Sequence, residues 1–177
     1  MSSIVDRMLR AARLDAHLYE EVEADQGALS QAMGVVALSS VAAGIGAPDG
    51  GGLGAIIIGT VASLLGWFVW AYLAYFIGTR FLPEPETHAD LGELLRTTGF
   101  SSSPGLIRIV GIIRPLAGLA FLVAGIWMLV AMVIAVRQAL DYKSTGRAVG
   151  VCVIGFVVQL AIFFLLMAMI GVSTGNS

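Results

Sequence analysis

Four long stretches without a charged residue constrain this chain more than any other feature. They hold 23, 30, 22 and 30 residues and lie between Asp25 and Asp49, between Asp49 and Arg80, between Arg114 and Arg137, and after Arg147. A helix needs about 20 apolar residues to cross the hydrocarbon core of a bilayer. Only 12% of the 177 residues are charged, against about 25% in a soluble domain. The sequence therefore predicts an all-α integral membrane protein.

Residues 1–27 form the charged end of the chain and predict a cytosolic amphipathic helix. Apolar residues recur at three- and four-residue steps from Ile4 to Val22, with arginines and acids between them. No apolar core comes before about residue 28, so the segment lacks the pattern of a cleavable signal. The helix either lies on the membrane surface or packs on the protein's own cytosolic loops, and the pattern favours neither.

The distribution of basic residues predicts how often the chain crosses the membrane. Residues 104–140 would extend about 55 Å as a helix, too long for one crossing of about 30 Å. Arg80 and Arg96 flank this run on one side, and three basic residues lie in 137–147 on the other. Because basic loops stay in the cytosol, two crossings are expected between them. We therefore expect five spans, the third short and proline-interrupted, at 29–47, 53–79, 102–114, 116–136 and 148–172, followed by a tail at 173–177.

This layout predicts a cytosolic N-terminus, an external C-terminus, and three polar candidates within the five-span domain of residues 28–172. Arg108 and Arg114 lie in and at the end of the broken third span, and Gln159 lies in the middle of the fifth. Ionisable groups at membrane depth are rare and usually functional, and broken helices line transporter sites. We expect the Arg108 side chain to reach toward the cytosolic surface and Arg114 to lie outside.

The sequence predicts neither a catalytic nor a metal-binding group. Glu84 and Glu86 stand between prolines and indicate a solvated turn, while His17 and His88 have nothing that places them together. The one cysteine, Cys152, lies in an apolar stretch and is typical of a small packing residue. No zinc spacing, phosphate-binding loop or basic run is present. We expect a non-enzymatic protein with no cofactor and no nucleic-acid partner.

Two stretches of the sequence resemble the Yip1 family of membrane proteins. "GELLRTTGFSSSPGLI" resembles the pattern in which a cytosolic amphipathic stretch ends in a glycine–aromatic pair at Gly99 and Pro104 opens the third span. "GIWMLVAMVIAVRQALDYKSTGRAVGVCV" resembles its continuation. Here the features are Trp127 in the fourth span and a basic turn before the fifth, with Arg137, Lys143 and Arg147. The resemblance covers about residues 30–172 and is to the short bacterial branch.

The resemblance implies a five-helix membrane domain with a cytosolic N-terminus. Eukaryotic members serve vesicle traffic in the Golgi and endoplasmic reticulum and bind small GTPases. This chain has no counterpart of their longer N-terminal region, so GTPase binding is not carried over. We expect a homo-oligomer of the bacterial inner membrane that organises or shapes the bilayer, with anionic headgroups as its contacts and its protein partner unknown. The alternative is a small oligomeric transporter or channel that uses the polar groups of the third span.

Overall fold

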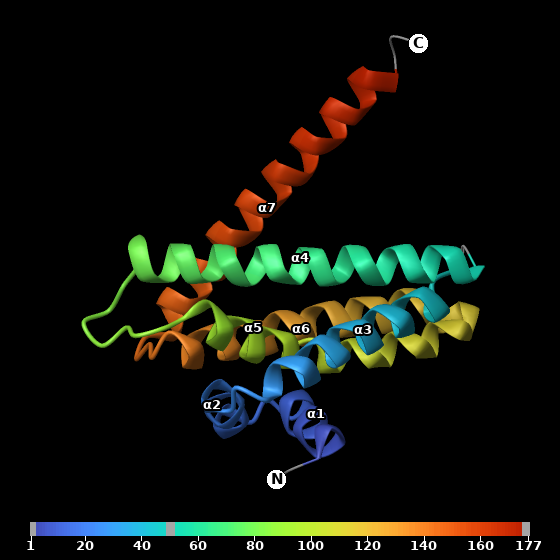
Figure 1. Ribbon diagram of the computed structural model, residues 1–177. Helices are drawn as coiled ribbons and strands as arrows, with labels where there is room; N and C mark the ends of the chain where they lie inside the picture. The colour runs from blue at the N-terminus through green and yellow to red at the C-terminus, as the bar shows by residue number, and fades with distance from the viewer. Residues whose placement is uncertain (1–2, 49–51, 175–177) are drawn as a thin grey trace.

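The computed structural model describes residues 3–48 and 52–174, and within these ranges every regular element is a helix (Figure 1). The elements are α1 Ile4–Ala12, α2 Ala16–Ala24, α3 Ala28–Gly46, α4 Gly52–Arg80, α5 Leu91–Phe100, the 3₁₀ helices η1 Ser103–Ile112 and η2 Arg114–Leu116, α6 Ala117–Ala139 and α7 Thr145–Thr174. Four helical stretches in the described part are long and apolar enough to cross a membrane, namely Ala28–Gly46, Gly52–Arg80, Arg114–Ala139 and Thr145–Leu166. The all-α prediction is confirmed.

The expected third span is a 3₁₀ helix with an α-helix before it, not a short α-helix. Pro104 lies in the first turn of η1, where its missing N–H costs no helical hydrogen bond. A 3₁₀ helix rises about 2.0 Å per residue, so ten residues extend about 20 Å. The backbone becomes extended at Ile113, and Pro115 follows inside η2. The proline interruption therefore lies at the end of this segment.

The segment made of α5 and η1 runs parallel to α3. Gly99 lies against Ala32, Gly105 lies against Ser39, and Gly111 lies against Gly46. The partner positions advance together along both segments, so α5–η1 follows α3 over most of its length. The segment therefore traverses the same depth as α3.

The contact between Gly46 and Gly111 is made by backbone alone. A β-carbon on Gly46 would overlap the carbonyl oxygen of Arg108, and one on Gly111 would overlap the carbonyl oxygen of Gly46. Backbone atoms at the ends of two helices cannot move aside as a side chain does. Glycine is therefore required at both positions for η1 to lie this close to α3.

The single amphipathic helix expected at the N-terminus is two helices, α1 and α2. Leu14 adopts the left-handed conformation, with a φ of 62°, which ends the first helix. Asp15 then caps the second, because its carboxylate accepts a hydrogen bond from the backbone N–H of His17 at 3.0 Å. Sequence periodicity continues through this turn, so it does not show the reversal. We call α1 and α2 together the cap.

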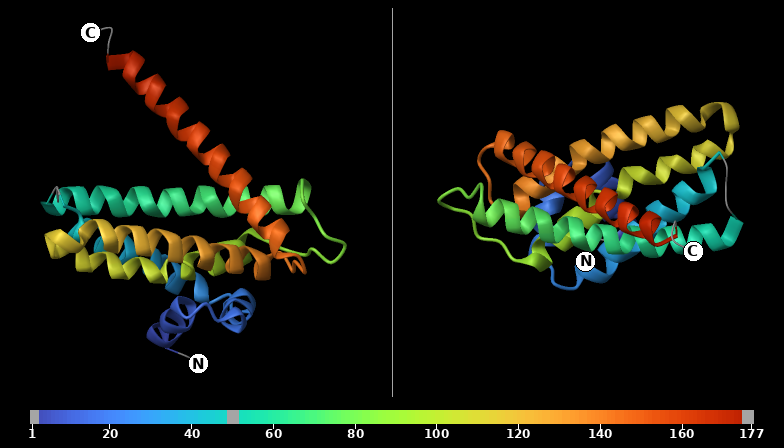
Figure 2. Two further views of the ribbon diagram at one scale, coloured as in Figure 1. Left: turned by 180° about the vertical axis from the view of Figure 1, so that it is seen from behind. Right: turned by 90° about the horizontal axis from the view of Figure 1, so that it is seen from above.

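The helices α3, α4, α6 and the segment α5–η1 form a bundle, and the cap lies across one side of it (Figures 1 and 2). The last helix, α7, begins beside α4 and α6 and then diverges from the bundle. It continues to Thr174, so the first two residues of the expected tail are helical, and residues 175–177 lie outside the described part. The bundle thus has one lateral side occupied by the cap and another that α7 leaves partly open.

Candidate functional site

A polar cavity of about 300 Å³ lies between the helices of the bundle. The cavity lies about halfway along the helices, because it is lined by Gly66, the central residue of α4, and by Gln159, which lies midway along α7. Its polar lining comes from α3, α4, η1 with the residue before it, and α7, and consists of Ser39, Ser40, Ser63, Ser102, Arg108 and Gln159. The fold therefore brings together two of the three polar residues singled out from the sequence.

Arg108 is the charged residue of this cavity. Its Nη2 donates to the sulfur of Met128 at 3.0 Å, and its guanidinium carbon lies 5.7 Å from the centroid of the Phe121 ring. Its Nε is buried and has no hydrogen-bond partner among the described residues. The side chain thus lies against α6 at the cavity, whereas the sequence predicted that it reaches the cytosolic surface.

The other polar groups around the cavity differ in whether they are already bonded. The hydroxyl of Ser63 donates to Ser40 Oγ at 3.0 Å. The indole N–H groups of Trp67 and Trp70 are used in packing, since they donate to Thr98 Oγ1 at 3.2 Å and to Met132 Sδ at 3.0 Å. The two tryptophan rings therefore belong to the apolar part of the cavity lining. Arg108, the serines and Gln159 form its polar part.

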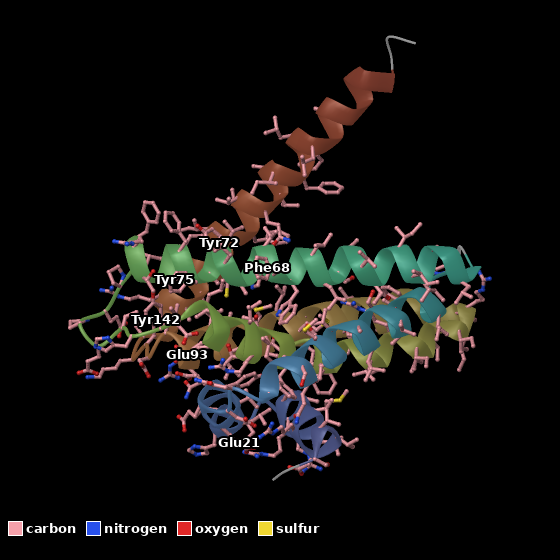
Figure 3. All side chains as sticks on the ribbon, viewed as in Figure 1. Glu21, Phe68, Tyr72, Tyr75, Glu93 and Tyr142 are labelled. Atoms are coloured by element: carbon pink, nitrogen blue, oxygen red, sulfur yellow. The ribbon has the colours of Figure 1, made fainter. Side chains whose placement is uncertain are left out.

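The cap is held together by ion pairs. Only 5% of the Arg7 side chain is exposed, and it donates to Glu21 at 3.0 Å, to Asp25 at 2.8 Å and to Gln31 at 3.0 Å. The Arg7 guanidinium lowers the pKa of Asp25 below its usual value by hydrogen bonding. Figure 3 shows Glu21 in the cap, on the side away from α4. The charges of α1 and α2 are thus satisfied mainly by each other and by the start of α3.

A second set of contacts fixes the cap to the bundle. The guanidinium of Arg96 in α5 donates to the carbonyl oxygens of Val22 and Glu23 at the end of α2, with Nε at 3.0 Å from each. The indole N–H of Trp127 donates to the carbonyl oxygen of Ala12 at 2.8 Å. Four apolar residues of the cap are fully buried where they pack against α3, α5 and α6, namely Ala11, Leu18, Tyr19 and Val22. The cap therefore packs on helices of the bundle rather than on cytosolic loops, and these contacts leave its outer side free to meet the membrane.

Glu23 is an acid of the cap whose pKa is raised close to neutrality. Burial, and then repulsion from Asp141 and Glu93, raises its pKa from 4.5 to about 7, while Arg96 opposes this shift. The folded protein therefore holds this proton more tightly than the unfolded chain does. The stability that this group contributes is present at low pH and is lost as the pH rises from 4.5 to about 7.

The basic turn between α6 and α7 contacts the loop that follows α4. The ammonium of Lys143 lies 2.7 Å from the carboxylate of Glu86, and the backbone N–H of Lys143 donates to Glu84 at 2.9 Å. The guanidinium of Arg147 donates to the carbonyl oxygen of Pro83 at 2.6 Å. Only 10% of the Glu84 side chain is exposed, so Glu84 does not belong to a solvated turn as predicted.

The side chain of Tyr142, labelled in Figure 3, connects the same turn to the end of α4 by hydrogen bonds. Its hydroxyl lies 2.9 Å from the carbonyl oxygen of Gly78 and 2.7 Å from that of Leu82. Arg137 stabilises the turn from within, because its Nε donates to the carbonyl oxygen of Tyr142 at 3.1 Å. The two loops, 81–90 and 140–144, therefore lie together at one end of the bundle.

Arg114 lies at the opposite end of the bundle from these loops. It donates to the carbonyl oxygen of Pro48, which follows α3. Among the described residues, no group of three His, Cys, Asp or Glu side chains is placed to hold a metal ion. Sequence reasoning missed Arg96 and Tyr142. The leucines that precede Arg96 in the amphipathic α5 were the available signal for the first, and none marked the second.

Comparison with known proteins gives one match. The family model described as Yip1 domain matches residues 25–167. No curated protein and no solved structure matches the chain. The matched region begins at Asp25, directly after the cap, and ends within α7.

Proposed function

The chain belongs to the Yip1 family, and we propose that it is a non-enzymatic protein of the bacterial inner membrane that organises and shapes the bilayer. In this proposal the chain crosses the membrane five times. The four apolar helices supply four crossings, and the segment α5–η1, which runs parallel to α3, supplies the fifth. The contact between Lys143 and Glu86 supports an even number of crossings between their loops.

The position of α1 is the observation that carries this proposal. Its last residue, Ala12, is bonded to Trp127, which lies 12 residues before the end of α6 at Ala139. Twelve residues of α-helix extend about 18 Å. Trp127 lies near the middle of α6, so the first helix of the cap lies beside the bundle rather than beyond its end, where its outer face can meet the bilayer.

Two large apolar side chains are exposed on the outer face of α1, beside the exposed acid Asp6. Val5 is 61% exposed and Leu9 is 54% exposed, one helical turn apart. An amphipathic helix buries such a face about 5–10 Å into the boundary between headgroups and acyl chains. Because the cap is bonded to α5 and α6, it cannot leave the leaflet freely. We infer that α1 acts as a wedge that expands the cytosolic leaflet and bends the membrane toward the cytosol.

Self-association would multiply this effect, and two features favour it. A β-carbon on Gly118 of α6 would meet open space, in contrast to one on Gly150, which would lie 3.3 Å from Leu82 of the same chain. Much of α7 beyond Phe156 is exposed as well. A small-residue position and a divergent helix are both typical of contacts between membrane helices. We propose a homo-oligomer in which several wedges lie in one leaflet.

The wedge is tested by replacing Val5 and Leu9 together with serine in the full chain. Reconstituted in liposomes, the native protein is expected to form tubules, and the double variant is expected to leave the liposomes spherical at the same protein density. The fold should be unaffected because both side chains are largely exposed. Electron microscopy of the liposomes gives the readout.

The matched control for this test is the pair His17→Ser and Ala24→Ser. Both residues are exposed on α2, and the variant should form tubules as the native chain does. Tubules from the Val5/Leu9 variant, or spherical liposomes with the native protein, would contradict the proposal.

A small transporter or channel is the second candidate function. The cavity that contains Arg108 and Gln159 favours it, because an ionisable group at membrane depth usually marks a ligand path. Transport is the second candidate because two common features of transporters are not seen. No acidic residue of the described part lines the cavity, and the sequence shows no internal repeat.

A further inference from the structure

We propose that the polar cavity binds the anionic headgroup of a membrane phospholipid through Arg108, with a hydrocarbon tail in an adjoining apolar groove. This site is separate from the wedge, which lies on α1. Arg108 lies on η1 and faces α6, and the cavity that it lines is formed mainly by α3, α4, α6 and α7. The two proposals therefore stand or fall independently.

The charge of Arg108 is the first argument for an anion. A guanidinium removed from water is costly unless it is paired. No Asp or Glu of the described residues lines the cavity. The contacts that the described residues make with the Arg108 guanidinium are a thioether sulfur, which is a weak acceptor, and an aromatic ring. Its buried Nε has no acceptor among the described residues. An oxyanion would supply the missing acceptor in the paired geometry that guanidinium groups favour.

The remaining polar lining has the hydrogen-bonding chemistry of an anion site. The hydroxyl groups of Ser39, Ser40 and Ser102 can donate, and the side-chain amide of Gln159 carries two N–H donors. A β-carbon on Gly66 would lie 3.8 Å from the amide nitrogen of Gln159, so this amide lies beside α4. These donors line the same cavity as Arg108, and phosphate oxygens can accept from them.

The adjoining groove is the argument for a lipid over a free anion. It has a volume of about 330 Å³ and shares Arg108, Trp70, Met128 and Met132 with the polar cavity. Its other lining residues are apolar, namely Gly125, Leu129 and Phe156. Inorganic phosphate would fill only the polar part. A phospholipid fills both, because its charged head and its hydrocarbon tail are joined as the two cavities are.

The course of α7 gives such a lipid a lateral route to the site. Gly155 packs closely on Trp70, where an added β-carbon would lie 3.2 Å from the indole ring. Beyond this contact α7 diverges from α4 and α6 (Figure 2). The exposed Phe156 borders the groove at the point of divergence. A lipid can therefore enter between α6 and α7 from the bilayer without crossing the bundle.

Native mass spectrometry of the full chain in detergent tests this site. The probes are phosphatidylglycerol, phosphatidylcholine with the same acyl chains, and inorganic phosphate. The native protein is expected to retain one phosphatidylglycerol per protomer, at least about tenfold more tightly than phosphatidylcholine, because both lipids carry the phosphate that Arg108 would bind but the choline cation of the second would lie near Arg108 with no acidic partner among the described lining residues. Arg108→Gln is expected to lower the affinity for phosphatidylglycerol to that for phosphatidylcholine.

Four further variants keep the test decisive. Arg114→Gln removes an arginine at the end of the bundle and should bind as the native protein does. Arg108→Lys keeps the charge and should retain part of the preference, and Gln159→Leu should weaken binding while leaving the helices intact. The Val5/Leu9 variant should bind lipid normally.

Three outcomes would overturn the lipid site. They are unchanged binding by Arg108→Gln, equal affinity of the native protein for the two lipids, and inorganic phosphate that binds and displaces phosphatidylglycerol. The last would assign the cavity to a free anion.

Discussion

Arg7→Ala is expected to lower the free energy of unfolding by about 2–3 kcal/mol, less than the cost of breaking a fully buried ion pair because the Glu21 and Asp25 side chains are 34% and 33% exposed. The Arg7 side chain is almost fully buried, and its removal deprives Glu21 and Asp25 of the guanidinium between them. Both acids would then repel each other within the cap. Chemical unfolding followed by the fluorescence of Trp127, which contacts the cap, measures the loss.

Two nearby arginines, one within α1 and one directly after it, provide the controls for this prediction. Arg13 is exposed, and Arg13→Ala should change stability by less than about 0.5 kcal/mol. Arg10 is partly exposed and pairs with Asp15 at 2.8 Å, so Arg10→Ala should fall between the two. A loss for Arg7→Ala no greater than that for Arg13→Ala would show that the buried ion pairs do not hold the cap in place.

Gly46→Ala is expected to cost about 3 kcal/mol or more, at the upper end of the range for overpacking. The new methyl group would overlap the carbonyl oxygen of Arg108. That oxygen belongs to the backbone of η1, so η1 must move away from α3. Thermal unfolding in detergent measures the destabilisation, and a lowered yield of folded protein would accompany it.

Gly54→Ala and Gly44→Ala are the matched controls in the same part of the fold. A β-carbon on Gly54 meets nothing within 4 Å, so this change should be neutral or slightly stabilising in a helix. At Gly44 the obstacle is the side chain of Ile56, 2.8 Å from the added carbon, and this side chain can rotate. If all three variants unfold alike, the close approach of η1 to α3 is wrong.

The helical content and the main crossings were predictable because the bilayer imposes them. A chain in hydrocarbon must satisfy its backbone within helices, so charge-free stretches such as 50–79 translate directly into α4. The form of the third segment was not predictable, because periodicity does not distinguish an α-helix from the 3₁₀ helix that begins at Pro104. The turn at Leu14 was also hidden, since leucine rarely adopts a positive φ.

The candidate site was predictable only where a residue was unusual for its surroundings. Arg108 and Gln159 stood out in apolar runs, and the fold places both at one cavity. The serines of the lining did not stand out, because small polar residues are common in membrane helices for packing alone. The basic turn was read as an orientation signal, and its contacts with Glu84 and Glu86 depend on a neighbouring loop that the sequence does not place.

The five-crossing topology is the central claim, because it places the cap and both contacting loops at one leaflet. Single cysteines at Pro48, His88, Ile113 and Ser144, in a Cys152→Ser background, test it with a membrane-impermeant maleimide. All four positions are exposed. The account predicts that His88→Cys and Ser144→Cys react from one side of the membrane, and that Pro48→Cys and Ile113→Cys react from the other. Labelling of Ile113→Cys together with His88→Cys, and of Ser144→Cys together with Pro48→Cys, would contradict it.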